Sequence, residues 1–427
     1  MNYRISHPTK ILKGTIELTA SKSESNRALI IQALCEDDFE IENLAKAEDT
    51  RVLKAILTAV KSNTSSEVQT YDVGAAGTTM RFLTAYLSSK KGVNCILTGS
   101  ERMKNRPIKI LVDALRDLGA DIEYIEKEGY PPLRIKGKEL EGSEVEIDGS
   151  VSSQYISALL LISPKLKNGL VLKFKGDVTS VPYINMTKKM MEEFGIVFQN
   201  WFYSFFGDSI NINRQDYHIK EKDYSYYVEA DWSSASYWYA IAALLKEVDF
   251  TIKGLKYPLG SLQGDSYIDG IFSKNFGVQS SWSVSCIHLT KSGEVEKEFN
   301  YNFSACPDIA QTVAVVVAAL NISSTFTGLH TLRIKETDRT LALKNELAKI
   351  GVEVEIVSDD MIKIYPKALV QQSSPIATYE DHRMAMAFAP LALVQDSIII
   401  EHPEVVKKSY PDFWNDLKKV GFVIEEV

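Results

Sequence analysis

The sequence predicts an α/β protein built from tandem copies of one strand–helix unit. An apolar strand that ends at a glycine, a polar loop, a helix, a second glycine and a further strand recur along the chain. Near-even periods of this kind mark repeat folds. A length of 427 residues exceeds what one core normally fills, so two or more domains are expected. The glycines that follow the helices stand 76, 82, 74 and 70 residues apart and are Gly119, Gly195, Gly277, Gly351 and Gly421.

Each unit is expected to have two halves. The first half, a strand that runs through a glycine into a polar loop, is predicted at 96–107, 172–182, 250–265 and 325–338. In the second half, the glycine after an amphipathic helix supplies a left-handed cap that releases the chain into the next strand. This half is predicted at 111–125, 190–198, 271–279, 343–356 and 414–427, with a degenerate sixth copy at 41–60.

An aromatic-rich stretch at 198–230 interrupts the pattern. A base-stacking surface would need cations interleaved with the aromatic rings, and most of this stretch lacks them. Aromatic residues favour strands, so a buried hairpin is expected here.

Composition and charge exclude several classes of protein. The net charge of −8 and the pI near 5.5 argue against a general binder of nucleic acid or anionic membranes. The first residues lack a signal-peptide stretch, and the longest apolar run, 313–320, is too short to span a bilayer. We therefore expect a cytoplasmic protein. Four cysteines without paired zinc-ligand spacing are expected to be small buried hydrophobes, namely Cys35, Cys95, Cys286 and Cys306.

The pentapeptide at 335–339 places two cations around two carboxylates. If a helix starts here, Lys335 and Arg339 are four residues apart and can face the same way. Asp338 suits a helix start, where free backbone N–H groups favour an anion. Glu336 and the two cations could then meet an anionic ligand together, although such a cluster is equally typical of a solvated helix face.

Further polar clusters stand at predicted helix starts in the first half of the chain. Lys22, Ser23 and Arg27 form either an anion site or a simple cap. Gly74 and Gly77 would let a backbone approach a ligand just before a helix that carries Arg81. The basic loop 99–106, which ends in Arg106, is most often a solvated loop. For Ser152, Ser153 and Gln154, capping is the favoured interpretation, although they also suit a phosphate or sugar-like hydroxyls.

The second half of the chain repeats this pattern. Asp308 precedes a very apolar helix and is either a cap or a functional carboxylate, and His382 is expected to be structural. Cations at equivalent points of successive units indicate that an acidic protein focuses them on one cleft. Arginine suits carboxylates and phosphates, so a small, highly anionic ligand is implied. These cations are Lys22, Arg27, Arg81, Arg106, Lys335, Arg339, Arg383 and Lys408.

The motifs together resemble the 5-enolpyruvylshikimate-3-phosphate (EPSP) synthase family. They are SKSESNR, GAAGTTMR, RMKNRPI, DGSVSSQ, DWSSASYW, LQGD, RIKETDR and YEDHRMAMAF, and they run from about residue 20 to 412 in the family's order. The resemblance implies a two-domain inside-out α/β barrel of six βαβαββ repeats, three in each domain. The implied domains are 21–230, and 1–20 with 231–427.

This resemblance implies that an enolpyruvyl group passes from phosphoenolpyruvate to the 5-hydroxyl of shikimate 3-phosphate, with release of phosphate, in aromatic amino acid biosynthesis. It implies a monomer that needs no metal or organic cofactor and binds neither nucleic acid nor membrane. Because the implied site residues come from both halves of the chain, we expect domain closure to assemble them.

The site residues are carried over from the matching motifs. The implied catalytic residues are Lys22, Asp308 and Glu336. Phosphoenolpyruvate would be held by Lys22, Gly77, Arg106, Arg339, Arg383 and Lys408, with Arg81 in support. Shikimate 3-phosphate would be held by Lys22, Ser23, Arg27, Ser152, Ser153, Gln154, Ser180, Tyr183, Asp308, Thr331 and Lys335.

The chain departs from the family pattern at Ala75, Phe82, Val181 and Thr331, where the family usually has Asn, Pro, a cation and Asn. These changes affect substrate contacts and leave inhibitor sensitivity open. Gly77→Ala is predicted to crowd the phosphoenolpyruvate site and to weaken glyphosate-like inhibitors.

Two alternatives are weighed. The chain also resembles, more distantly, UDP-N-acetylglucosamine enolpyruvyl transferase, but its loop 99–106 lacks that family's reactive cysteine. A non-catalytic binding protein on the same fold is the second alternative, because fold does not fix function. Such a protein would be expected to lose Lys22, Asp308 or Glu336, and all three are present.

Overall fold

The computed structural model describes residues 1–65, 67–150, 152–201, 209–365 and 367–427. The chain forms two compact units: unit 1 is Met1–Ser21 with Glu229–Val427, and unit 2 is Lys22–Val228. This division lies one residue from the first crossover expected from the sequence and two residues from the second. That each unit is an independent three-repeat domain stays a prediction. In the described part of the chain, no helix is long and apolar enough to cross a membrane.

Unit 2 contains two four-stranded sheets with the same topology. In each, a parallel pair is extended by an antiparallel hairpin whose later strand inserts beside the pair. The first sheet has the order β4 (Gln69–Asp72), β5 (Asn94–Thr98), β7 (Leu133–Lys136), β6 (Asp121–Tyr124). The second has the order β10 (Phe198–Asn200), β11 (Ser209–Ile212), β9 (Leu170–Lys175), β8 (Glu144–Asp148). A parallel pair joins β3 (Glu40–Glu42) to β12 (Ser225–Tyr227).

Unit 1 repeats this topology. One sheet has the order β14 (Val278–Ser283), β15 (Cys286–Lys291), β13 (Val248–Lys253), β2 (Leu12–Glu17). Another has the order β16 (Glu298–Asn302), β17 (Ser323–Thr327), β19 (Met361–Tyr365), β18 (Glu353–Ser358). The third joins β20 (Ile398–Glu401), β1 (Asn2–Ser6) and β21 (Val423–Glu426).

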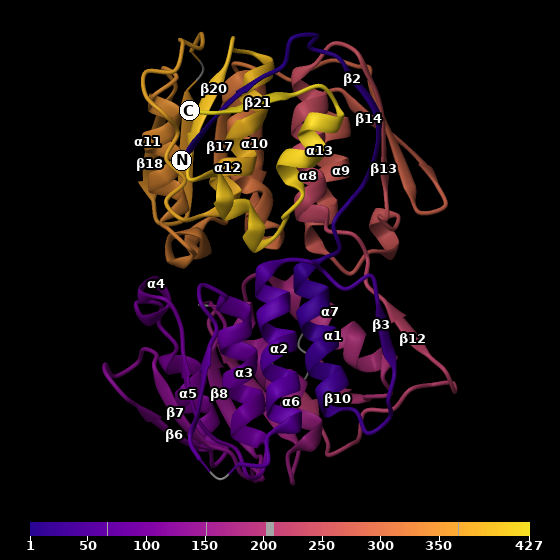
Figure 1. Cartoon of the computed structure of the whole chain (residues 1–427), viewed down its shortest axis with the longest axis vertical. Helices are drawn as coiled ribbons and strands as arrows, with labels where there is room; N and C mark the ends of the chain where they lie inside the picture. Colours follow the sequence, from indigo (N-terminus) through magenta and orange to yellow (C-terminus); the bar gives the residue numbers. More distant parts are fainter. Residues whose placement is uncertain (66, 151, 202–208, 366) are drawn as a thin grey trace. The chain divides into compact units, whose positions relative to one another are not determined.

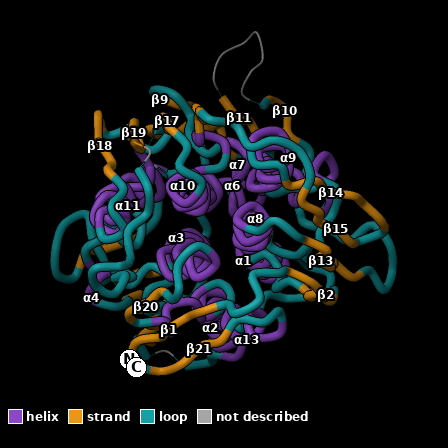
Figure 2. Tube along the Cα trace, turned by 90° about the horizontal axis from the view of Figure 1, so that it is seen from above, coloured by secondary structure: helices purple, strands orange, loops and turns teal. Residues whose placement is uncertain are grey.

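The N-terminal segment supplies strands to sheets of the C-terminal part. β2 pairs in parallel with β13 through Leu12 and Val248, and the two run side by side in Figure 1. β1 lies between β20 and β21, close to both chain ends in Figure 2. These pairings place residues 1–21 in unit 1.

Helices cover these sheets. Unit 2 contains α1 (Lys22–Leu34), α2 (Glu48–Ser62), α3 (Gly77–Ser89), α4 (Glu101–Lys104), α5 (Lys109–Asp117), α6 (Ser153–Ile162) and α7 (Val181–Glu193). Unit 1 contains α8 (Trp232–Leu244), α9 (Tyr267–Asn275), α10 (Ala310–Ala319), α11 (Arg339–Ala348), α12 (His382–Phe388) and α13 (Phe413–Lys419).

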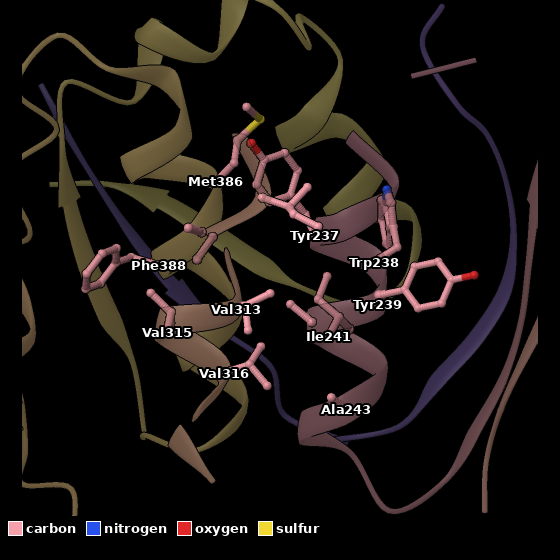
Figure 3. Close-up of a cluster of buried hydrophobic side chains, with 14 of the residues drawn as sticks. Tyr237, Trp238, Tyr239, Ile241, Ala243, Val313, Val315, Val316, Met386 and Phe388 are labelled. Carbon is pink, nitrogen blue, oxygen red and sulfur yellow. The ribbon is translucent and has the colours of Figure 1, made fainter. Parts of the chain in front are cut away.

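The core of unit 1 is built around mainly apolar helices that are buried on all sides. Trp238 of α8, Val316 of α10 and Phe388 of α12 are fully buried, and the three helices contribute neighbouring side chains in Figure 3. A helix that is hydrophobic all round belongs inside a protein core. The starts of α10 and α12 are therefore held rigidly, and Asp308 and Arg383 stand at these starts.

The repeat predicted from the glycines is confirmed. All five have positive φ, between +66° and +100°, and each stands between the helix and the strand predicted around it. The sixth, degenerate copy differs, because α2 is followed by Asn63 in extended backbone rather than by a left-handed glycine.

The aromatic stretch agrees in part with its prediction. β10 and β11 pair antiparallel, with Ile210 and Ile212 buried but Phe198 only partly so. Residues 202–208 lie outside the described residues. Cys95 and Cys306 are buried as expected, whereas Cys35 and Cys286 are partly exposed.

Candidate active site

The polar centre of unit 1 is the carboxylate of Asp308, in the 3₁₀ turn η5 (Pro307–Ile309) that leads into α10. Its Oδ1 lies 2.9 Å from Nη1 of Arg339 and 3.6 Å from Nζ of Lys335. Its Oδ2 lies 3.0 Å from Nη2 of Arg383. Asp308 therefore faces three cations, and its interpretation as a functional carboxylate stays a prediction.

Arg339 joins three carboxylates through one guanidinium. Its Nε donates to Asp381 at 2.7 Å, Nη1 to Asp308 at 2.9 Å and Nη2 to Glu336 at 3.0 Å. The side chain is 1% exposed. The planar fork of arginine suits such multiple recognition, whereas lysine would act as a single point charge.

Glu336 lies between two cations. Its Oε1 is 2.8 Å from Nζ of Lys408, and its Oε2 faces Arg339. The helix considered for 335–339 begins only at Arg339, with the carboxylate of Asp338 accepting from Leu341 N–H as its cap. Lys335 therefore lies before α11, and the shared helix face considered from the sequence is wrong.

A second contact network anchors Arg383. Its Nη2 donates to Ser233 Oγ at 3.2 Å, and its Nη1 donates to Tyr237 Oη at 3.4 Å. Ser233 in turn donates to the buried carboxylate of Asp265. Residues of α8 thereby hold Arg383 against Asp308.

The charges of this cluster shift several pKa values. Burial raises the pKa of Asp308, but the charges of Arg383, Lys335 and Arg339 outweigh burial and hold that pKa well below its ordinary 3.8. Burial lowers the pKa of Lys335 although Asp308 opposes this effect. Burial and the charge of Asp308 raise the pKa of Asp265 to about 7. The cluster thus holds one carboxylate ionised and a second poised near neutrality.

Asp265→Asn is expected to remove part of the pH dependence of stability. Between pH 3.8 and about 7, folded Asp265 holds a proton that the unfolded chain has released. The contribution of Asp265 to the free energy of unfolding of the wild type therefore decreases as pH rises over that window. The decrease is up to about 1.4 kcal/mol per pH unit. Urea unfolding of both proteins from about pH 4 to about pH 8 measures the difference. Parallel profiles would contradict this assignment.

In unit 2, Lys22 is the first residue of α1, and its Nζ lies 3.2 Å from the carboxylate of Asp49 at the start of α2. The side chain of Lys22 is 17% exposed, and that of Asp49 is 4% exposed. α1 is held beside α2 because Thr50 donates to Asn26 at 2.8 Å. The charge of a partly buried lysine is thus balanced by a buried carboxylate.

Arg27 is buried among acceptors of unit 2. It donates to Thr187 Oγ1 at 2.7 Å, Ser23 O at 2.8 Å, Ser157 Oγ at 3.0 Å and Tyr183 O at 3.1 Å. Burial lowers its pKa to about 10. Direct binding of a ligand by Arg27 would require exchange of these bonds, whereas its present contacts tie α1 to α6 and α7.

The remaining residues of unit 2 predicted to bind shikimate 3-phosphate stand at the starts of α6 and α7. Ser152 caps α6 by accepting from Gln154 N–H at 3.3 Å, as the sequence favoured, and Ser153 is its first residue. The side chain of Gln154 donates to Thr78 Oγ1 at 3.2 Å. Ser180 precedes α7 with φ of +53°, and its carbonyl accepts from Tyr183 N–H.

Gly77 is the first residue of α3 and lies against the guanidinium of Arg106. A Cβ built on Gly77 would lie 2.5 Å from Nη1 of Arg106 and 2.9 Å from its Cζ. Arg106 is 7% exposed. Arg81, one turn into α3, donates to Pro107 O at 3.0 Å, where Tyr155 Oη also donates at 2.6 Å. The structure therefore brings Gly77, Arg81 and Arg106 together, as the sequence predicted.

The structure places the four residues that depart from the family pattern. Phe82 is buried, and its ring centroid lies 5.4 Å from Cζ of Arg27, which is a cation–π distance. Thr331 is buried in the 3₁₀ turn η6 (His330–Ile334) of unit 1. Val181 is the first residue of α7, and Ala75 precedes α3.

Sequence reasoning missed several polar residues of these clusters, among them Asp49, Ser233, Asp265 and Asp381. These four are buried, and each contacts a residue singled out as a site candidate or that residue's partner. Their motifs were noted, but an acidic residue at a helix start looks like a cap. Asp381 indeed caps α12, by accepting from Arg383 N–H at 2.9 Å.

Comparison of the chain with known proteins identifies its family. The family model for EPSP synthase (3-phosphoshikimate 1-carboxyvinyltransferase) matches residues 6–417. The chain belongs to the EPSP synthase family. In the described part of this EPSP synthase family member, no group of three or more His, Cys, Asp or Glu residues could hold a metal ion.

Individual EPSP synthases agree with this assignment. A 3-phosphoshikimate 1-carboxyvinyltransferase of Bacteroides fragilis (strain YCH46) is 49% identical over 426 residues, which cover 100% of this chain and 99% of that protein. One from Haemophilus influenzae (strain Rd) is 38% identical over 438 residues, covering 97% and 98%. A solved EPSP synthase structure from Acinetobacter baumannii has a TM-score of 0.76 at 20% identity and covers 100% of both chains, which supports the inside-out α/β fold.

Proposed function

We propose that this chain transfers the enolpyruvyl group of phosphoenolpyruvate to the 5-hydroxyl of shikimate 3-phosphate and releases phosphate. The observation that carries the proposal is the position of Glu336 between Lys408 and Arg339, with Asp308 joined to the same arginine. This arrangement combines carboxylates able to move protons with cations able to hold an anion.

The chemistry needs both kinds of group. As the 5-hydroxyl attacks C2 of phosphoenolpyruvate, C3 gains a proton and a tetrahedral intermediate forms. That intermediate expels phosphate as C3 loses a proton, which restores the double bond. Glu336 moves the proton at C3, helped by Lys22, while Asp308 contacts or deprotonates the attacking hydroxyl.

The cations match the charge of the substrates. Phosphoenolpyruvate and shikimate 3-phosphate together bring on the order of five to six negative charges. Lys22 and Arg106 of unit 2 and Arg339, Arg383 and Lys408 of unit 1 serve phosphoenolpyruvate, with Gly77 at its backbone. The groups that serve shikimate 3-phosphate are Lys22, Ser23, Arg27, Ser152, Ser153, Gln154, Ser180, Tyr183, Asp308, Thr331 and Lys335. A cytoplasmic monomer is part of this proposal.

Phosphate release from the purified protein with phosphoenolpyruvate tests the function. The assay is run with shikimate 3-phosphate, with UDP-N-acetylglucosamine, and with neither. We expect release only with shikimate 3-phosphate and loss of that release in Lys22→Ala. Release only with the nucleotide sugar would assign the sister activity, and release with neither would favour a binding protein.

Gly77→Ala is expected to raise the KM for phosphoenolpyruvate about tenfold or more, because displacement of one cationic contact costs at least one charge-assisted hydrogen bond. The added methyl group would overlap the guanidinium of Arg106 and push it out of position. Inhibition by glyphosate should weaken in parallel, while the KM for shikimate 3-phosphate changes little. Steady-state kinetics measure all three.

Gly260→Ala is a suitable control, because its added methyl group meets open space in unit 1. Gly92→Ala is not suitable, because Gly92 has φ of +89°. Unchanged inhibition in Gly77→Ala would refute the placement of Gly77.

A further inference from the structure

The turn that delivers Asp381 to Arg339 contains two consecutive left-handed residues. Tyr379 and Glu380 have φ of +53° and +58°. Side chains disfavour this conformation because Cβ crowds the following carbonyl oxygen. Two such residues in succession persist only where their surroundings enforce them, and such places are often functional.

Glu346 of α11 provides that enforcement. Its carboxylate, 1% exposed, accepts from Tyr379 Oη at 2.6 Å and from Ala377 N–H at 2.9 Å. Lys349 extends this contact to the chain just before the turn, because its Nζ lies 2.7 Å from Glu346 and donates to Pro375 O at 2.7 Å. One buried carboxylate thus fixes the chain before and within the left-handed pair.

We call the contacts of Glu346 with Tyr379, Ala377 and Lys349 the clamp. The hydroxyl of Tyr379 is a hydrogen-bond donor in this clamp. Burial and the hydrogen bond to Glu346 raise the pKa of Tyr379 to about 12, so the hydroxyl keeps its proton at neutral pH. A hydrogen bond to an ionised carboxylate is stronger than one between neutral groups. The hydrogen bond from the Tyr379 hydroxyl therefore ties the backbone of the turn at residue 379 to Glu346.

The turn then sets the position of two arginines. Asp381 N–H donates to Thr378 O at 2.8 Å, which closes the turn. The carboxylate of Asp381 accepts from Arg383 N–H at 2.9 Å and from Arg339 Nε at 2.7 Å. Arg339 and Glu346 stand seven residues apart on α11, on one helix face. The same helix therefore carries an arginine of the site and the clamp that orients its partner.

We propose that Glu346 and Tyr379 are positioning residues for the phosphoenolpyruvate-binding arginines Arg339 and Arg383. This inference rests on the proposed function, which assigns both arginines to that substrate. Glu346 and Tyr379 act only through the left-handed turn and Asp381. Loss of the clamp lets Tyr379 and Glu380 relax toward ordinary backbone angles, and Asp381 then no longer fixes the arginine fork.

Tyr379→Phe tests the clamp, because it removes the donor and keeps the ring. We expect the KM for phosphoenolpyruvate to rise at least about fivefold and the KM for shikimate 3-phosphate to change less than about twofold, since small misplacements of binding groups are costly. The matched control is Tyr365→Phe, whose hydroxyl donates to Glu355 on an exposed part of the same unit. Its kinetic constants should equal those of the wild type.

A second substitution separates positioning from simple loss of stability. Glycine adopts positive φ without strain, so Glu380→Gly added to Tyr379→Phe should return the KM for phosphoenolpyruvate toward the wild-type value. A KM for phosphoenolpyruvate that Tyr379→Phe leaves unchanged would overturn the inference, as would a raised KM that Glu380→Gly fails to restore. Absence of phosphate release by the wild type would instead overturn the proposed function.

Discussion

Glu336→Gln is expected to lower kcat about a thousandfold, within the range that a general acid or base contributes. The amide keeps the size of the side chain but neither gives nor takes a proton at C3 of phosphoenolpyruvate. Glu336 accepts from Lys408 through one oxygen and from Arg339 through the other. An amide offers only one acceptor, so the KM for phosphoenolpyruvate should rise as well. Phosphate release with both substrates measures kcat and KM.

Glu353→Gln is the matched control for this experiment. Glu353 forms an exposed ion pair with Lys367 at 2.8 Å in the same unit. Exposed pairs of this kind contribute little to stability because solvent screens them, so both folding and kcat should be retained. If kcat of Glu336→Gln stayed within about tenfold of the wild type, Glu336 would act neither as a proton carrier nor through its charge, since the amide lacks both.

Arg339→Met is expected to cost about 3–5 kcal/mol of stability and to lower kcat/KM for phosphoenolpyruvate more than a hundredfold, about the loss expected when a buried charge pair is broken. The side chain of Asp381 is fully buried, and those of Asp308 and Glu336 are 15% and 13% exposed. Removal of the guanidinium leaves these three carboxylates without their common donor. The urea midpoint near neutral pH measures the stability change.

Arg333→Met is the matched control for Arg339→Met. Arg333 also contacts two carboxylates, Asp338 and Asp359, but its side chain is 40% exposed. Solvent screens such pairs, so the expected cost is about 0–1 kcal/mol. Equal urea midpoints for the two variants would mean that the buried carboxylates near Arg339 find other partners or take up protons.

The sequence predicted the repeat because its signals are local. A glycine after an amphipathic helix encodes the left-handed cap within a few residues, and five such junctions formed where expected. The insertion of β1 between β20 and β21 has no such signal, because strand register depends on partners far along the chain. The helix considered at 335–339 begins only at Arg339, because Asp338, which the sequence marked as suited to a helix start, is its cap.

The candidate site shows the same limit. Lys22, Gly77, Arg106 and the residues at 335–339 stand out because such clusters recur at the helix starts of successive units, although each alone also suits a cap or a solvated surface. Asp381 does not, because one of its oxygens caps α12 as any aspartate could. Its second contact is with Arg339, which lies 42 residues away, and only the fold reveals that contact. The clamp through Glu346 was missed for the same reason.

The place of the first two strands has a consequence for the newly made chain. β2 leaves the ribosome early, yet its partner β13 begins at Val248 and the partner of β1 in β20 begins at Ile398. At roughly 5–20 residues per second, β2 waits on the order of ten to fifty seconds for β13. Residues 22–228 are contiguous, so unit 2 can fold during that interval. An unpaired strand is a template for association with other chains, which makes this delay the period when the nascent protein most needs a chaperone.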